Sequence, residues 1–285
     1  MPPSPTTHTI TSLAEFLDVI GSLPTQPRGF YTFRGERNSA WSVAPGIMRP
    51  NRKKLLTHER DAVRELLSVH PNEFINDISM FDKLVRMQHY GLPTRLLDVS
   101  ANPLVGLFYA TGTVDRKLEA PTDGKVFYIR VPDIRRKYFD SDAVSCIANL
   151  ANMSEAEKSV LNSNRTGSVA QFKLLDETDR LVQFIRAEKP SFRSMVNPRD
   201  LNRIWYVVPK LNNRRIIAQN GAFLIFGFSA TPARPILNPI QFKSIIVPAG
   251  RKSAIRKELA MLGITKGSLF PEIDYAADHI VERYK

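Results

Sequence analysis

The stretch that decides the fold is RLLDVSANPLVGLFYA, residues 95–110. After the arginine, its first half is mostly apolar and predicts a buried strand. Asn102 is a favourable N-cap and Pro103 a favourable first helical residue, so the apolar residues that follow are expected to form a helix. The stretch therefore predicts a strand, a turn and a helix in direct succession.

Around this unit, helices and short strands follow one another without strict alternation. Helices are predicted for residues 13–21, 55–69, 74–90, 251–262 and from 272 onward, and strands for 30–34, 125–131, 204–208, 223–228 and 242–247. Irregular order favours an α+β fold over a doubly wound parallel sheet, in which strands and helices alternate. We expect an α+β fold with short-stranded mixed or antiparallel sheets and surrounding helices.

The chain shows no internal repeat and no long linker, so a single domain is expected over residues 1–285. Residues 134–190 are polar, helical in pattern and poor in strands, and we expect them to form a helical insertion within that domain. Ser12 and Glu15 have the spacing of a capping box at the first helix. Trp41 and Trp205 are expected in the core. The alternative is that Tyr31, Phe33 and Trp41 form a stacking platform for bases.

The composition indicates a globular protein with an excess of positive charge. The 285 residues are 43% hydrophobic and 24% charged, which is enough apolar material for a sizeable core. Lys and Arg number 40 against 28 Asp and Glu, a net charge of +12. Such an excess attracts polyanions, which favours a nucleic acid or a phosphate-bearing ligand as partner. The basic residues are spread along the chain, however, as they are on ordinary solvated surfaces.

The single cysteine, Cys146, excludes a disulfide within the chain and a thiolate zinc cluster built by this chain alone. It lies in an apolar helical pattern and is expected to be a buried small side chain. The N-terminal residues do not resemble a secretion signal, and no apolar run reaches the ~20 residues of a spanning helix. We expect a cytoplasmic protein with no membrane partner and no bound metal.

The common catalytic signatures are absent. The sequence contains no GxxxxGK[ST] phosphate-binding loop, no GxGxxG after a strand, no HExxH and no GxSxG nucleophile elbow. The candidates for chemistry therefore come from two other clusters.

The first cluster is YTFRG, residues 31–35. Arg34 leaves a strand just before Gly35, where a guanidinium can bind a phosphate or carboxylate and a glycine lets the ligand approach the backbone. The alternative is a structural arginine that pairs with an internal carboxylate.

The second cluster is QHYGLPTRLLDVS, residues 88–100. His89 can exchange a proton near neutral pH, Tyr90 can stack on a flat ring, and Asp98 can orient a histidine or an arginine. The other polar candidates here are Thr94, Arg95 and Ser100. So many polar groups beside an apolar strand indicate a site, although a histidine before a turn is often only a packing residue.

The chain resembles the FRG domain family at five places. They are FRG at 33–35, QHYGLPTRLLD at 88–98, NPLVGLFYA at 102–110, QNGAF at 219–223, and LGI at 262–264 with SLFPEID at 268–274. The departures are small: Val99 and Ser100 stand where an aromatic residue and a threonine are usual, and Gly106 where alanine is usual.

A fainter resemblance is to one class of ADP-ribosyltransferases, in which an arginine, a hydroxyl and an acidic or amide residue from three strands form the site. Arg34, Ser100 and Gln219 occur here in that order. The resemblance implies NAD as co-substrate. It implies that Arg34, Ser100, Gln219 and His89 are catalytic. The residues expected to bind the cofactor are Arg34, Gly35, Tyr90, Thr94, Arg95 and Asp98.

Gln219, the third residue of the arginine, hydroxyl and acidic or amide set, differs from the residue that is most usual there. Many such transferases carry a glutamate there, whose charge stabilises the cation that develops on the ribose, and Gln219 offers only a dipole. Glu36, Asp98 or Glu177 is expected to supply that charge. The alternative for Gln219 is that its side chain caps the turn at Asn220-Gly221.

The resulting expectation is an NAD-dependent ADP-ribosyltransferase-like enzyme that modifies a macromolecular acceptor, RNA or DNA, as a bacterial toxin or phage-defence effector. An acidic protein inhibitor or antitoxin is a further expected partner. Two alternatives remain open at this point. One is a non-catalytic module that binds nucleic acid or a nucleotide, and the other is a nuclease that uses His89 and Asp98.

Overall fold

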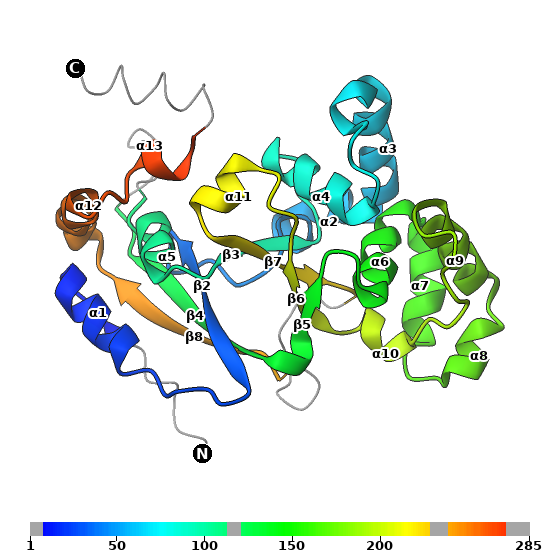
Figure 1. Ribbon diagram of the computed structural model, residues 1–285, viewed down its shortest axis with the longest axis horizontal. Helices are drawn as coiled ribbons and strands as arrows, with labels where there is room; N and C mark the ends of the chain where they lie inside the picture. Colours follow the sequence, from blue (N-terminus) through cyan, green and yellow to red (C-terminus); the bar gives the residue numbers. More distant parts are fainter. Residues whose placement is uncertain (1–7, 113–120, 229–238, 272–285) are drawn as a thin grey trace.

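The computed structural model describes residues 8–112, 121–228 and 239–271 (Figure 1). It is an α+β protein with one mixed sheet, as the sequence predicts. The strands are β1 (His8–Thr9), β2 (Gly29–Glu36), β3 (Leu96–Ser100), β4 (Gly124–Pro132), β5 (Arg136–Tyr138), β6 (Ile204–Val208), β7 (Gly221–Phe226) and β8 (Gln241–Val247). Their order in the sheet is β1-β8-β4-β2-β3-β7-β6-β5. The two edge pairs, β1 with β8 and β5 with β6, are parallel, and the inner pairs are antiparallel.

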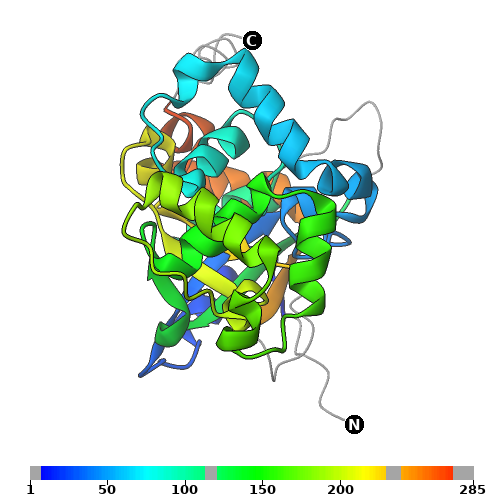
Figure 2. The same ribbon diagram turned by 90° about the vertical axis from the view of Figure 1, so that its right-hand side faces the viewer.

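Helices surround this sheet. They are α1 (Leu13–Gly21), α2 (Lys53–Thr57), α3 (Glu59–Val69), α4 (Met80–His89), α5 (Pro103–Ala110), α6 (Asp142–Ala148), α7 (Glu155–Ser163), α8 (Val169–Lys173), α9 (Asp176–Glu188), α10 (Pro198–Leu201), α11 (Arg214–Ala218), α12 (Lys252–Met261) and α13 (Lys266–Leu269). The range 134–190 contains α6 to α9, which lie in front of the sheet in Figure 2. It also contains the short strand β5, which the sequence pattern does not predict.

Two hydrophobic clusters cover one face of the sheet. Helices α1, α5 and α12 pack on β2, β4 and β8 through Phe16, Leu107 and Ile255. Helices α3, α4, α6, α7 and α9 pack on β3, β6 and β7 through a second cluster that contains Phe81 and Ile185. The sheet therefore carries helical layers at both ends of its order.

The third cluster fills the other face of the sheet, which curls on itself. Residues of β3, β4, β6 and β7 pack together there, among them Val99, Ile129 and Leu224. The rings of Phe30 on β2 and Tyr206 on β6 meet edge to face with centroids 4.8 Å apart, although β3 and β7 stand between these strands in the sheet order. This curvature, normal for a twisted sheet, brings distant strands together.

Several predicted boundaries differ from the structure. The helix predicted at 55–69 is broken at His58 into α2 and α3, and α4 begins only at Met80, where Ser79 accepts a hydrogen bond from the backbone N–H of Asp82. Ser12 accepts from the backbone of Glu15 as predicted, but the carboxylate of Glu15 bonds to Thr11 and not to Ser12. The helix predicted from 272 lies outside the described residues.

Two single-residue predictions have different outcomes. Cys146 is buried, as expected, and burial raises the pKa of its thiol. Trp205 is in the core at 4% exposure, but Trp41 is only half-buried and the expectation that it is a core anchor is wrong. Within the described residues, no helix combines the length and apolar character needed to cross a membrane.

Candidate functional site

The candidate site lies where β2 and β3 separate. These strands pair only at Phe33 and Ser100. Beyond that pair, Nη1 of Arg34 donates to the backbone carbonyl of Asp98 at 2.7 Å. A side chain thus supplies the hydrogen bond that a continued strand ladder would have made.

A cavity of about 290 Å³ opens beside this separation, and we call it the Arg34 cavity. The polar and aromatic residues that line it are Phe33, Arg34, Glu36, Arg37, Trp41, Asp98, Ser100, Tyr109, Arg215 and Gln219. They come from β2, the segment after it, β3, α5, α11 and the turn that follows α11. The three residues of the transferase resemblance, Arg34, Ser100 and Gln219, are therefore brought to one cavity.

Arg34 is held by two carboxylates and a carbonyl. Its Nε donates to Oε1 of Glu36 at 2.8 Å, and its Nη1 lies 3.9 Å from Oδ2 of Asp98. Arg34 and Glu36 are two residues apart on β2, so their side chains share a face of the strand. Burial opposes the charge of Arg34, but the nearby Glu36 and Asp98 raise the pKa of its guanidinium above the ordinary value. Arg34 is thus a fixed cation at the cavity wall, 17% exposed.

Gly35 has a packing role that explains the glycine in the FRG sequence. A Cβ at this position would lie 1.9 Å from the carbonyl oxygen of Gly106 and 2.6 Å from the backbone nitrogen of Ala110. Both are backbone atoms of α5, so no side-chain rotation relieves the clash. Gly35 therefore allows α5 to lie directly on β2, which brings Tyr109 to the Arg34 cavity.

Ser100 ties two chain segments together. Its hydroxyl donates to the backbone carbonyl of Gln219 at 2.6 Å and accepts from the N–H of Asn102 at 2.9 Å. Ser100 thereby joins the end of β3 to the turn between α11 and β7. Asn102 in turn caps α5 by accepting from the N–H of Leu104, as the sequence predicts.

Gln219 positions a tyrosine. Its Oε1 accepts from the hydroxyl of Tyr109 at 3.1 Å, and its Nε2 donates to the carbonyl of Leu269 at 3.0 Å. The alternative that its side chain caps the turn at Asn220-Gly221 is therefore wrong. Burial raises the pKa of Tyr109, opposed by Arg215 and reinforced by Asp98, which keeps the hydroxyl protonated and able to donate.

Asp98 presents the most accessible carboxylate of the cavity, with a side chain 56% exposed. Its Oδ2 accepts from Nε2 of Gln88 at 2.7 Å, and Oε1 of Gln88 accepts from the hydroxyl of Thr94 at 2.6 Å. This chain orients the carboxylate. Thr94, expected to bind a cofactor, is 2% exposed and reaches the site only through Gln88.

Trp41 lies at the cavity between two arginines. The guanidinium carbons of Arg37 and Arg49 are 5.2 and 5.4 Å from its ring centroid. An aromatic surface with flanking cations suits a nucleotide, whose base can stack while its phosphates meet positive charge. The alternative prediction, a stacking position at Trp41, is thus compatible with its place at the cavity.

The other predicted site residues lie outside the Arg34 cavity. His89 lines a neighbouring cavity of about 60 Å³, the His89 cavity, together with Asp98, Arg215 and Gln219. Tyr90 is 63% exposed and lines a further cavity of about 130 Å³. His89 and Tyr90 contact each other edge to face. Glu177, a candidate for the missing charge, lies in the first turn of α9 in the helical layer, whereas Glu36 and Asp98 line the Arg34 cavity.

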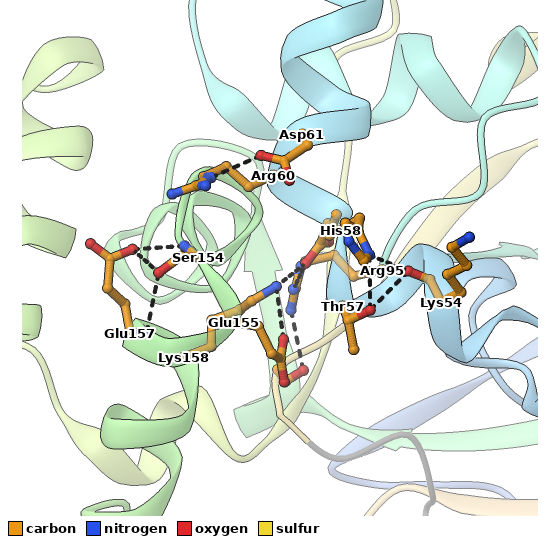
Figure 3. Close-up of polar contacts among 12 residues, drawn as sticks. Lys54, Thr57, His58, Arg60, Asp61, Arg95, Ser154, Glu155, Glu157 and Lys158 are labelled. Carbon is orange, nitrogen blue, oxygen red and sulfur yellow. Dashed lines mark hydrogen bonds and ion pairs between the residues drawn. The ribbon is translucent and has the colours of Figure 1, made fainter.

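Arg95 is placed in the core. It is 2% exposed and forms two hydrogen bonds with the carboxylate of Glu59, which also accepts from Nζ of Lys158 at 3.1 Å (Figure 3). Its Nη1 donates to the carbonyls of Phe226 and Gly227. This network joins α3, β3 and α7. The guanidinium of Arg95 therefore does not reach the Arg34 cavity.

Sequence reasoning missed three residues of the cavity, Arg37, Tyr109 and Arg215, and it offered Trp41 only as part of an alternative stacking platform. Tyr109 belongs to the apolar helix pattern of 104–110, which masks its polar end. Arg215 belongs to the basic pair Arg214-Arg215, and such pairs are usually solvated, whereas Arg37 is an isolated basic residue that follows Glu36. The only usable signal was that Tyr109 lies in the NPLVGLFYA motif.

A second large cavity, of about 360 Å³, is lined by residues of β2, β4 and β8, including Tyr31, Arg130 and Lys243. It contains none of the residues predicted to be catalytic or to bind the cofactor. Tyr31, expected with Phe33 and Trp41 in the alternative stacking platform, lines this cavity and not the Arg34 cavity. In the part of the chain that the structure describes, no group of three or more His, Cys, Asp and Glu side chains could hold a metal ion. The Arg34 cavity is therefore the candidate functional site.

The protein is an α+β protein with one mixed sheet and a cavity, lined by charged, polar and apolar residues, at the separation of two strands. The model of the FRG domain matches residues 30–118, which run from β2 past α5 and include most of the cavity wall. Searches of curated proteins and of solved structures found no match.

Proposed function

We propose that this protein is an NAD-dependent ADP-ribosyltransferase-like enzyme that modifies a nucleic acid. The observation that carries the proposal is the convergence of Arg34, Ser100 and Gln219, from three separate segments, on one cavity with three aromatic side chains. A guanidinium, aromatic rings and an accessible carboxylate are the groups that such a reaction needs.

The residues present suit NAD. The cavity, at about 290 Å³, is at the lower end of the range for ligand pockets and matches part of a dinucleotide rather than all of it. Trp41 and Tyr109 offer stacking surfaces for its rings, and Arg34 and Arg37 offer positive charge for its oxygens. In the reaction, NAD supplies the ADP-ribosyl group, and the bond from ribose C1′ to the nicotinamide nitrogen breaks with its electron pair leaving on the nicotinamide.

The side chains of the cavity have distinct tasks in this proposal. Asp98 stabilises the positive charge that develops on the ribose, and takes the place of the glutamate usual at the position of Gln219. Arg34 binds an anionic or hydroxyl oxygen of the co-substrate. Ser100 and Gln219 act as positioning residues, because their polar groups are already bonded to the backbone and to Tyr109. The acceptor atom forms the new bond to C1′ and loses its proton.

The net charge of +12 supports a polyanionic acceptor, RNA or DNA. Modification of cellular nucleic acid would suit a toxin or a phage-defence effector, and an acidic protein would suit its inhibitor. A nuclease is the second candidate, because His89 and Asp98 line the same small cavity.

The test incubates the full chain with NAD labelled in the adenylate phosphate and with total RNA or DNA. Label on the nucleic acid supports the transferase, strand breaks without NAD support the nuclease, and retention without either reaction supports a binding module. Either of the last two results would overturn the proposal.

The variant Asp98→Asn tests the proposed role of the Asp98 carboxylate. It keeps the shape of the side chain and an oxygen for Gln88, so the fold is expected to persist. We expect the rate of label transfer to fall by about 10²–10³, as when one electrostatic contact to a transition state is removed. Asp61→Asn, which removes an exposed carboxylate of α3, is the matched control and is expected to keep the wild-type rate.

A further inference from the structure

Another cavity, of about 210 Å³, adjoins the Arg34 cavity and shares Arg34 and Asp98 with it. We call it the Arg52 cavity. It is also lined by Arg49, which precedes the 3₁₀ turn Pro50–Arg52, by Arg52, the last residue of that turn, and by Gly46 and the loop after α4. Three arginines thus converge on a space that opens next to the proposed site.

The carboxylates here do not balance the arginines. Five arginines, Arg34, Arg37, Arg49, Arg52 and Arg215, line the two cavities, and the acids that line them are Glu36 and Asp98. Oε1 of Glu36 is shared, since it accepts from Arg34 at 2.8 Å and from Nη2 of Arg49 at 3.4 Å. Nη1 of Arg52 donates to the carbonyl of Gly46, a neutral acceptor. The two cavities together therefore carry an excess of positive charge.

Arg49 carries the clearest indication of a binding position for an anion. Its Nε is buried and has no hydrogen-bond partner in the described part of the chain. Burial lowers the pKa of Arg49; Glu36 opposes this effect, and the neighbouring Arg34, Arg52 and Arg37 add to it. A buried donor without a partner and a cation surrounded by cations are both unfavourable, and a bound anion would relieve both.

We propose that the Arg52 cavity is a phosphate subsite in which Arg49 and Arg52 bind phosphate oxygens beside Arg34. The forked guanidinium matches the geometry of a phosphate group, and several such groups together suit a diphosphate or two successive phosphodiesters. The identity of the molecule that carries the phosphate rests on the proposed function: it is NAD, through its diphosphate, or the nucleic-acid acceptor, through its backbone. In both cases the arginines bind phosphate oxygens.

The first experiment needs no turnover. Binding of inorganic pyrophosphate to the full chain is measured by titration calorimetry for the wild type, Arg52→Gln and Arg52→Lys. We expect Arg52→Gln to weaken binding by about 10-fold or more, and Arg52→Lys, which keeps the charge but not the fork, to have a smaller effect. Arg193→Gln, which removes an exposed charge after α9, is the matched control and should bind as the wild type does.

Thermal unfolding of each variant followed by circular dichroism shows that the fold is kept. Pyrophosphate binding to Arg49→Gln is measured as well. This variant reports on the subsite only if its unfolding temperature equals that of the wild type. Absence of pyrophosphate binding to the wild type, or equal weakening in Arg52→Gln and Arg193→Gln, would overturn the subsite.

A second pair of titrations identifies which molecule supplies the phosphate that binds in the Arg52 cavity. Weaker binding of NAD to Arg52→Gln assigns the subsite to the dinucleotide, and weaker binding of a short single-stranded RNA with unchanged NAD affinity assigns it to the acceptor. No change for either ligand overturns the proposal. Because these are binding measurements, an inactive wild-type protein that still binds pyrophosphate through Arg52 would reject the transferase and keep the subsite.

Discussion

At the scale of single residues, Asp98 shows how one side chain becomes available for chemistry. Its backbone carbonyl accepts from Arg34 and so completes the hydrogen bonding at the edge of β3. Its carboxylate, oriented by Gln88, stays 56% exposed at the cavity. The structural and the functional demands on Asp98 therefore fall on different atoms.

Cys146 provides a test at this scale. Burial raises the pKa of its thiol, so that the reactive thiolate is scarce at pH 8 and reagents have no access. We expect the native protein to leave a thiol reagent such as DTNB unreacted, and the guanidinium-unfolded protein to react with one equivalent, since the chain has a single cysteine. Rapid reaction of the folded protein would contradict the burial.

At the scale of elements, the contact between β2 and α5 depends on Gly35. Gly35→Ala places a methyl group against backbone atoms of α5. We expect the free energy of unfolding to fall by about 1–3 kcal/mol, as for other overpacked sites, and the Arg34 cavity to be distorted through Tyr109. Urea unfolding measures the change. Gly21→Ala, where an added Cβ meets nothing within 4 Å, is the control, and an equal loss in both variants would contradict the close approach.

The buried ion-pair network of Glu59, Arg95 and Lys158 also joins separate parts of the fold. Glu59→Gln leaves two buried cations without their shared carboxylate and is expected to lower the free energy of unfolding by about 3–5 kcal/mol at pH 7. Asp61→Asn on the same helix removes a surface pair (Figure 3) and is expected to change it by less than about 1 kcal/mol.

The same network makes stability depend on pH. Burial opposes ionisation of Glu59, but Arg95 and Lys158 lower its pKa below the ordinary value. The unfolded chain therefore takes up this proton first as the pH falls, and the stabilisation present at neutral pH is lost in acid. The difference between wild type and Glu59→Gln is expected to shrink below about pH 4. A constant difference down to pH 3 would contradict this account.

At the scale of the whole molecule, the helices in the range 134–190 share a core with the sheet. Leu150 and Ile185 belong to the same cluster as Leu96, Trp205 and Phe223 of the strands. The helical layer therefore has no separate core on which to fold, and we expect it to unfold together with the sheet.

Trp41→Phe leaves Trp205 as the single tryptophan, a fluorescence reporter for the sheet. Its thermal transition is expected to coincide with the loss of helical circular dichroism at 222 nm. An earlier loss of the helical signal would show that the layer is an independent unit.

Much of the fold and part of the site follow from local sequence. The cap at Asn102, Pro103 at the first position of α5 and the apolar run of β3 are short-range effects, so the strand–turn–helix unit is predicted with nearly correct ends. The places of Arg34, Ser100 and Gln219 on separate segments follow in the same way. The role of Gln219 cannot be predicted from local sequence, because its hydrogen-bond partners, Tyr109 and Leu269, are 110 and 50 residues away in the chain.

The sequence by itself determined the class of fold, the main helices and strands, and the resemblance to the FRG domain, because capping, apolar periodicity and motifs act over a few residues. Only the tertiary structure decided that β2 and β3 separate, that Trp41 and Tyr109 line a cavity while Arg95 is buried, and that five arginines lie near two acids. The physical reason is that burial and electrostatic fields are sums over the whole fold, so similar basic and aromatic residues along the chain acquire different roles.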